Sequence, residues 1–254
     1  MKYKIVVKTT NKNSHRVELC LDTWLKDKDY VCLTDRLTGK FNEVSGSERE
    51  DYHSAEEKTV FMINQIIDGH YNDYDWIAFI DDDAILNTKM FEAILPFLNK
   101  NYLYGLDMAG GAFKQDPNLS YPSGGCGYFI SPETAFGRKR MTSKNIGIED
   151  ASMGYWLREN NIPINTAVRL NGWFPFQKEY EKIYHTGIQA HHKDFGPKIL
   201  DQVEDHNEKK QMILSCMTHH YIRTPELMNY IYDIFQEWIP NNLNQALNRI
   251  NFFV

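Results

Sequence analysis

The chain has 254 residues, of which 42% are hydrophobic and 24% are charged, so it has enough apolar side chains to form a globular core. Its 28 basic and 34 acidic residues give a formal net charge of −6, and no basic run occurs, which argues against a nucleic-acid partner. No apolar stretch approaches the roughly 18 residues that span a bilayer, and the first residues are too poor in apolar side chains for a signal peptide.

The first half of the chain alternates short apolar runs with amphipathic segments. Residues 76–80 form a continuous apolar run, as in parallel strands that are covered on both faces. The polar stretch from residue 36 to about 52 shows no periodicity and is expected to be an irregular loop. Strands are expected over 3–7, 30–34, 76–80, 106–113 and 128–130, and helices over about 17–25, 60–67 and 90–98. This alternation predicts an α/β fold with a mainly parallel central sheet.

The second half is less regular, with a helix expected over 149–158, a strand over 164–170 and mainly helical structure from about residue 200. An apolar stripe is formed there by Leu227, Ile231, Ile234, Phe235 and Trp238. We interpret the stripe as packing, so that residues 1–200 and a helical extension over 201–254 make one structural domain. The alternative is a surface for a partner subunit or a membrane, although the polar face lacks the basic residues of interfacial helices.

Three consecutive aspartates, Asp81, Asp82 and Asp83, follow the strand over 76–80. In open α/β sheets, ligands bind beyond the carboxyl ends of the strands. Adjacent carboxylates at that place repel one another unless a cation neutralises them, and such oxygen ligands suit Mg²⁺ or Mn²⁺. A solvated turn or a helix cap is the alternative. The position at the end of a buried strand favours the metal site.

Two further segments can be read as part of a binding site or as local structure. Gly124 and Gly125 lie in a glycine-rich segment before the strand over 128–130, where they allow a close approach to a ligand or simply form a tight turn. Glu149 and Asp150 begin a helix, where carboxylates are favoured by the helix dipole. If this pair lines a cleft, one of the two can serve as a general base.

The histidines occur partly as adjacent pairs, at 191–192 and at 219–220. Neighbouring residues on a strand point to opposite faces, and such pairs occur more often on a surface or in a core than as ligands. From the residues alone, metal binding is therefore the less favoured interpretation of either pair.

Five segments, in order, resemble the fringe family of inverting β1,3-glycosyltransferases and its relatives, including the core 1 galactosyltransferases. They are VVKTT (6–10) with HR (15–16) and DTWL (22–25), VCLTD (31–35), WIAFIDDD (76–83), SGGCGYFIS (123–131), and the acidic pair at 149–150 with Gly154. The resemblance covers about residues 3 to 195. Each motif by itself is weak, but five in the family's order and spacing are a specific signal.

The resemblance implies a GT-A fold, which is a Rossmann-like nucleotide-sugar transferase fold. It implies a UDP-sugar bound through Mn²⁺ or Mg²⁺, and transfer of a hexose or N-acetylhexosamine with inversion to a glycan, glycolipid or glycoprotein hydroxyl in a β1,3 linkage. The residues that it places at the nucleotide sugar are Thr9, Thr10, Arg16, Asp35, Asp81, Asp82, Gly124 and Gly125.

The resemblance also implies roles in the chemistry. Asp83 is expected to ligate the metal directly, with Asp81 beside it. The family's metal histidine follows the acidic helix and a strand, which points to His191, with His192 as the second choice. Asp150 is assigned as the base that deprotonates the acceptor hydroxyl, and Glu149 is the less favoured choice.

The sequence departs from the family in two respects. WFPF at 173–176 stands where fringe members carry a histidine, so the metal histidine stays open. The cysteine pattern, membrane anchor and stem of the secreted enzymes are missing, and the four cysteines lack CxxC spacing. We therefore expect a cytoplasmic microbial or viral enzyme with reduced thiols, and leave peripheral membrane contact open.

Two other classes of function compete with this hypothesis. A catalytically silent carbohydrate-binding or scaffold protein can keep the same fold, because fold does not imply function. A metal-dependent phosphodiesterase or nuclease can use the same aspartates, but it requires further carboxylates for two metals and leaves the glycine-rich segment unexplained.

Overall fold

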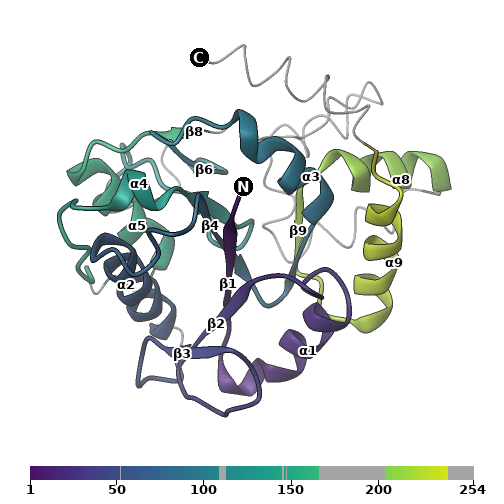
Figure 1. Ribbon diagram of the computed structural model, residues 1–254, viewed down its shortest axis with the longest axis horizontal. Coiled ribbons are helices and arrows are strands. Elements are labelled where there is room, and N and C mark those ends of the chain that lie inside the picture. Colours follow the sequence, from purple (N-terminus) through teal and green to yellow (C-terminus); the bar gives the residue numbers. More distant parts are fainter. Residues whose placement is uncertain (52, 109–112, 145, 147, 166–203, 240–254) are drawn as a thin grey trace.

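The computed structural model describes residues 1–51, 53–108, 113–144, 146, 148–165 and 204–239 (Figure 1). At its centre is a seven-stranded sheet with the strand order β3-β2-β1-β4-β7-β6-β8. Parallel pairing joins β1 to β2 and β4, β2 to β3, and β6 to β8, whereas β7 is antiparallel to both of its neighbours. The expected α/β fold with a mainly parallel central sheet is confirmed.

The strands of this sheet are β1 (Tyr3–Lys8), β2 (Tyr30–Thr34), β3 (Glu43–Ser45), β4 (Trp76–Asp81), β6 (Leu103–Gly105), β7 (Tyr128–Ile130) and β8 (Ile164–Asn165). A separate antiparallel pair consists of β5 (Ala84–Leu86) and β9 (Thr218–His220). The α-helices are α1 (Ser14–Asp22), α2 (Ser54–Ile67), α3 (Thr88–Ile94), α4 (Pro132–Ala135), α5 (Glu149–Glu159), α8 (His206–Ser215) and α9 (Pro225–Gln236). Short 3-10 helices occupy Asn11–Asn13 and Leu95–Phe97.

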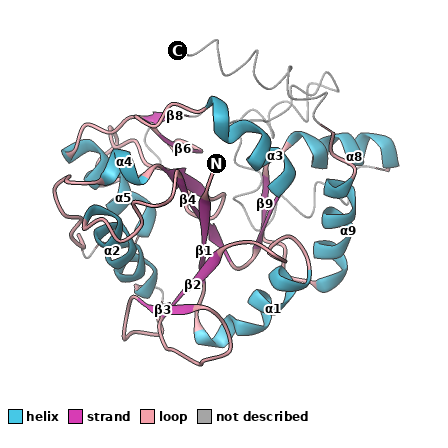
Figure 2. Cartoon of the chain, viewed as in Figure 1, coloured by secondary structure: helices cyan, strands magenta, loops and turns pink. Residues whose placement is uncertain are grey.

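Helices cover both faces of the central sheet, with α2, α4 and α5 on one side and α1, α3, α8 and α9 on the other (Figure 2). In β1, the side chains of Ile5 and Val7 belong to one hydrophobic core, and that of Val6 belongs to the other. A strand covered in this way has no polar face, because successive side chains point to opposite sides. This explains the continuous apolar run over 76–80.

The carboxy-terminal segment shares a core with the amino-terminal strands. Ile231, Phe235 and Trp238 of the apolar stripe are buried in the same cluster as Ile5. Strand β5 begins directly after Asp83, and β9 pairs with it from the far end of the chain. In this pairing His220 stands opposite Ala84. These stripe residues are therefore buried in the core, whereas the division at residue 200 and the single domain stay predictions, and residues 201–203 and 240–254 of the expected extension lie outside the described residues.

Two expectations about single elements are wrong. Of the strand expected over 106–113, residues 106–108 and 113 belong to no strand, and residues 109–112 lie outside the described residues. The strand of this region, β6, ends before that range, and its Leu103 and Tyr104 are buried and pair with β7 and β8. The segment 36–52 contains β3, an edge strand whose three residues are too few to show a period-2 pattern. Of the strand expected over 164–170, the first two residues form β8 and the rest lie outside the described residues.

Among the helices that the structure describes, none has the length and apolar character needed to cross a bilayer.

Candidate active site

The site lies where the strand order of the sheet reverses. From β1 the chain adds β2 and β3 on one side, and β4 then lies on the other side of β1. Open α/β sheets bind ligands in the crevice at this switch point, beyond the carboxyl ends of the strands. Lys8 is the last residue of β1 and Asp81 the last residue of β4, and Asp82 and Asp83 follow Asp81 directly. Because Phe79 pairs with Tyr128 of antiparallel β7, the glycine-rich segment at 123–127 enters at the same edge.

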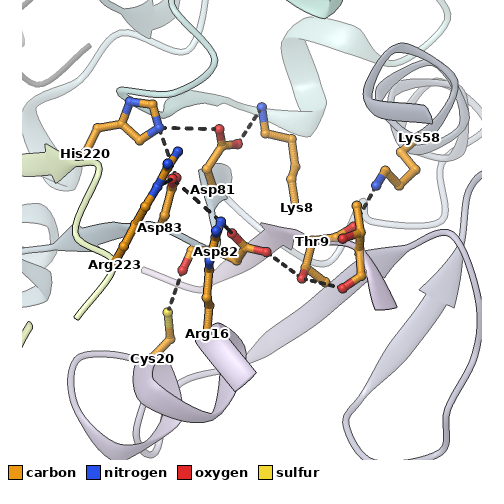
Figure 3. A network of polar contacts seen from close by, with 11 residues as sticks. Lys8, Thr9, Arg16, Cys20, Lys58, Asp81, Asp82, Asp83, His220 and Arg223 are labelled. Atoms are coloured by element: carbon orange, nitrogen blue, oxygen red, sulfur yellow. Dashed lines mark hydrogen bonds and ion pairs between the residues drawn. The ribbon is translucent and has the colours of Figure 1, made fainter. Parts of the chain in front are cut away.

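Asp81, Asp83 and His220 bring three potential metal-ligand atoms within 4.8 Å of one another (Figure 3). The Nε2 atom of His220 lies 3.0 Å from Oδ1 of Asp83 and 3.9 Å from Oδ2 of Asp81. Asp83 and His220 are buried, and Asp81 is half-buried. Two carboxylates and an imidazole form a donor set that fits a divalent cation such as Mn²⁺.

The histidine in this cluster is not the one that the resemblance favours. His191 and His192 lie outside the described residues, so their assignment stays a prediction. Alternation along β9 points His220 toward the aspartates. His219 faces away, with its Nε2 3.2 Å from the carbonyl oxygen of Ile213. The pair at 219–220 thus contributes one residue to the site, through a pairing of β9 with β5 that local sequence patterns do not reveal.

Gly125 leaves room for the ring of His220. A Cβ atom on Gly125 would lie 2.2 Å from Cε1 of that ring, well inside any contact distance. At Gly124, a Cβ would instead meet Oδ1 of Asp150 at 2.4 Å. The two neighbouring glycines therefore accommodate different functional side chains.

Replacing Gly125 with alanine is expected to displace His220 and to weaken Mn²⁺ binding roughly tenfold or more, as loss of ligand support does in metal sites. The measurement is a titration with Mn²⁺, in which the unbound ion is followed by electron spin resonance. Gly124→Ala is the matched control, because its added methyl group would displace Asp150 and leave His220 in place. Equal losses in both variants would contradict a specific role for the contact between Gly125 and His220.

The three aspartates already have cationic partners within the protein. Nζ of Lys8 lies 3.0 Å from Asp81, NH1 of Arg16 lies 3.2 Å from Asp82, and Nε of Arg223 donates to Asp83 at 2.8 Å. The sequence indicated that this triplet needs a bound cation to relieve its repulsion. The structure shows that Lys8, Arg16 and Arg223 supply compensating charge from three separate elements.

The environments of these aspartates differ. Burial alone would raise the pKa of Asp83, but hydrogen bonds and favourable electrostatic interactions with His220 and Arg223 outweigh it and lower the pKa to about 2. The pKa of Asp82 is raised to about 6, because burial and the charge of Asp83 outweigh its contacts with Thr9 and Arg16. Asp83 is therefore the carboxylate most firmly held in its ionised form.

The carboxylate of Glu149, at the start of α5, accepts hydrogen bonds from three side chains. Nζ of Lys8 lies 2.9 and 2.8 Å from its two carboxylate oxygens. Thr59 and Tyr128 each donate a hydroxyl hydrogen bond of 2.9 Å to Oε1. Burial lowers the pKa of Lys8, yet the charges of Asp81 and Glu149 outweigh it and hold this pKa well above its usual value. Lys8 thus links the aspartate cluster to the acidic pair.

Asp150 is less buried than Glu149 and accepts a hydrogen bond from the backbone of Gly124. Burial and the neighbouring charge of Glu149 raise the pKa of Asp150 to about 7, against the opposing effect of Lys8. A carboxylate with this pKa gains and loses a proton near neutral pH, as a general base must.

The residues expected at the nucleotide also surround the strand ends. Oγ1 of Thr9 donates to Asp82 at 2.7 Å, and the carbonyl oxygen of Thr9 accepts a bond of 2.6 Å from Lys58. Thr10 is half-buried and precedes the first 3-10 helix. Asp35 follows β2, and its Oδ1 atom accepts a hydrogen bond of 2.8 Å from the backbone N–H of Asn11. Its buried Oδ2 has no hydrogen-bond partner among the described residues.

Several residues of the site escape sequence reasoning. Lys8 and Tyr128 lie within motifs of the resemblance but carry no assigned role there, and His220 belongs to a histidine pair for which metal binding is the less favoured interpretation. Lys58, Thr59 and Arg223 carry no local signal, because a lone lysine, threonine or arginine on a helix or loop is usually solvated. The residues that sequence reasoning missed are Lys8, Lys58, Thr59, Tyr128, His220 and Arg223.

No protein-family model and no curated protein matches this chain. Among solved structures, it is similar to the apo structure of the bifunctional glycosyltransferase WbbM, with 10% identity and a TM-score of 0.44 over 98% of this chain and 51% of that one. It is also similar to a glycosyltransferase involved in glycosylation of the major capsid of PBCV-1, with 12% identity and a TM-score of 0.37; the match covers 91% of this chain and 99% of that one. The chain spans about half the length of WbbM. With both TM-scores below 0.5, these likenesses assign neither a fold family nor an activity to it.

Proposed function

We propose that this protein is a metal-dependent inverting glycosyltransferase of the GT-A type. It transfers a hexose or N-acetylhexosamine from a UDP-sugar to a hydroxyl group of a glycan, glycolipid or glycoprotein, and the fringe-like motifs favour a β1,3 linkage. The observation that supports this proposal best is the Asp81, Asp83 and His220 cluster at the switch point of the sheet, with Asp150 bound to the glycine-rich segment beside it. A nucleotide diphosphate and an acceptor hydroxyl are the two reactants that these groups suit.

The donor side of the site is formed by the ends of β1 and β4. Asp83, Asp81 and His220 would hold Mn²⁺ or Mg²⁺, which when bound stabilises the negative charge of a departing diphosphate. Thr9 and Arg16 fix Asp82 from the other side. Thr10, Asp35, Gly124 and Gly125 complete the surface that we assign to the nucleotide sugar.

On the acceptor side, the contacts favour Asp150 over Glu149 as the base. Glu149 is engaged by Lys8, Thr59 and Tyr128, so its lone pairs are already used within the protein. Asp150 has its Gly124 contact and a pKa of about 7. In the proposed reaction, Asp150 takes the proton of the acceptor hydroxyl as that oxygen attacks the anomeric carbon, and UDP departs from the opposite face. Glu149 holds Lys8 in place.

Activity is expected to fall below about pH 7. Asp150 accepts a proton only when it is ionised, and its raised pKa of about 7 places the loss of the ionised form at that pH. Because the ionised fraction falls about tenfold per pH unit below the pKa, kcat/KM should do the same. The measurement is kcat/KM between pH 5 and 9 with a saturating metal concentration. A profile that stays flat down to pH 5 would exclude Asp150 as the base.

The proposed function is tested by calorimetric titration of UDP into the protein with Mn²⁺ and again with EDTA. Binding that requires Mn²⁺ is expected, because diphosphate and metal share the site. UDP-sugars should then be hydrolysed slowly in the absence of an acceptor, and the sugar that is hydrolysed identifies the donor. Absence of UDP binding in both titrations would refute the proposal.

A catalytically silent protein of the same fold is the second candidate, and one observation favours it. Lys8, Arg16 and Arg223 each lie beside one of the aspartates, so part of the negative charge of the cluster is compensated without a metal. The raised pKa of Asp150 favours the enzyme instead, because a structural carboxylate would be stabilised by an ion pair. Metal-dependent UDP binding without hydrolysis or transfer for any UDP-sugar would identify the silent protein.

A further inference from the structure

Arg223 borders the aspartate cluster but has no part in the function described above. It lies between β9 and α9, and its Nε atom donates a hydrogen bond of 2.8 Å to Oδ2 of Asp83. Its side chain is 49% exposed, whereas that of Arg16 is 20% exposed. Figure 3 shows both guanidinium groups close to the aspartates. Of the two, Arg223 is the more accessible to a ligand.

The position of Arg223 is fixed by its own segment. The guanidinium carbon lies 4.8 Å from the ring centre of Tyr221, which in turn stacks on the His220 ring at 4.0 Å. Tyr221 has a φ of 62°, in the left-handed region that a bulky residue rarely adopts. The N–H of Ile222 bonds the carbonyl oxygen of Asp83 at 2.8 Å and secures this turn. The turn therefore places an arginine beside the cluster at some conformational cost.

The guanidinium group keeps most of its hydrogen-bonding capacity. It contacts Asp83 through Nε and Tyr221 through its face, and its terminal nitrogens have no hydrogen-bond partner among the described residues. Arg16, by contrast, directs its terminal nitrogen NH1 toward Asp82 and Asp83. A guanidinium that is anchored at one nitrogen and presents its two amino groups matches the geometry of a phosphate oxygen pair.

We propose that Arg223 binds the diphosphate group of the donor through its terminal nitrogens, while Nε stays on Asp83. This inference rests on the proposed function, because it takes the diphosphate as the ligand of the site. It assigns a donor-binding role to a residue outside every motif of the sequence. It also means that diphosphate charge is balanced by protein as well as by metal.

The proposal predicts two effects of opposite sign when Arg223 is removed. A diphosphate loses a charged hydrogen-bond donor, so its affinity should fall about 10- to 100-fold. A divalent cation loses a repelling positive charge beside Asp83, so its affinity should stay unchanged or rise. If Arg223 served only to orient Asp83, its loss would weaken Mn²⁺ binding and would affect diphosphate only through the metal.

The experiment compares the wild-type protein with Arg223→Ala, Arg223→Lys and the control Arg140→Ala, which removes an exposed arginine paired with Asp68. Mn²⁺ affinity is measured first, and then the affinities for inorganic pyrophosphate, UDP and UMP at saturating Mn²⁺. We expect Arg223→Ala to weaken pyrophosphate and UDP binding far more than UMP binding, and Arg223→Lys to restore part of the loss. Arg140→Ala should match the wild type.

The outcomes separate this inference from the proposed function. If the wild type binds UDP with Mn²⁺, and Arg223→Ala binds UDP and pyrophosphate as tightly as the wild type does, the inference is wrong and the proposed function stands. A loss of Mn²⁺ affinity in Arg223→Ala, with proportionate losses for UMP and UDP, also overturns it. If the wild type binds pyrophosphate through Arg223 but does not bind UDP, the nucleotide donor is wrong and the anion site stands. Failure to bind either ligand refutes both.

Discussion

Replacing Asp83 with alanine is expected to abolish metal-dependent UDP binding and to lower the transfer rate by about 10³-fold or more, since a metal ion contributes several kcal/mol to such reactions. Asp83 is the only member of the aspartate triplet whose pKa is lowered, to about 2, so it is ionised at every pH at which the protein is expected to act. It also contacts His220, the proposed nitrogen ligand. The measurement pairs calorimetry of UDP with Mn²⁺ and the rate of sugar transfer.

Two further variants make this prediction specific. Asp83→Asn keeps the shape of the side chain and removes only its charge, so it should lose metal and UDP binding almost as fully as alanine. Asp68→Asn removes an exposed aspartate paired with Arg140 and should behave like the wild type. Unfolding in urea checks that each variant keeps the fold. Unchanged metal affinity in a folded Asp83→Ala protein would refute the metal assignment.

Replacing Asp150 with asparagine is expected to lower the transfer rate by about 10²- to 10⁴-fold, the usual contribution of a general base. UDP binding with Mn²⁺ should remain within a few-fold of the wild type, because the proposed function assigns Asp150 to the acceptor side and the carboxamide keeps nearly the same size. The combination of lost turnover with retained nucleotide affinity separates a base from a metal ligand. Single-turnover rates and calorimetry on one protein preparation measure both.

Glu149→Gln serves as the comparison for Asp150→Asn. The glutamine keeps hydrogen-bonding capacity toward Thr59 and Tyr128 but loses the charge that raises the pKa of Asp150. In Glu149→Gln, the fall of kcat/KM at low pH should therefore persist but begin at a lower pH than in the wild type. If Glu149 were the base, Glu149→Gln would lose the acid limb and Asp150→Asn would retain it. That result would reverse the assignment of the two carboxylates.

The sequence by itself determined the features that depend on local pattern. The apolar run over 76–80 identified a strand that is covered on both faces. Because Asp81 to Asp83 come after this run in the chain, they had to lie at the carboxyl end of the strand, where open α/β sheets bind ligands. The order of strands and helices was enough for an α/β fold with a mainly parallel sheet. The acidic pair at the start of α5 was likewise a local signal.

Only the tertiary structure decided which distant residues complete the site. His220 reaches the aspartates because β9 pairs with β5, and Arg223 follows from the turn after it. Lys8 joins Asp81 to Glu149 because β1 lies beside β4 and α5 begins above their ends. Periodicity reports only which side of an element is buried, whereas these contacts depend on how elements far apart in the chain pack. The compensation of the aspartate charges by the protein's own cations could not be read from the sequence for the same physical reason.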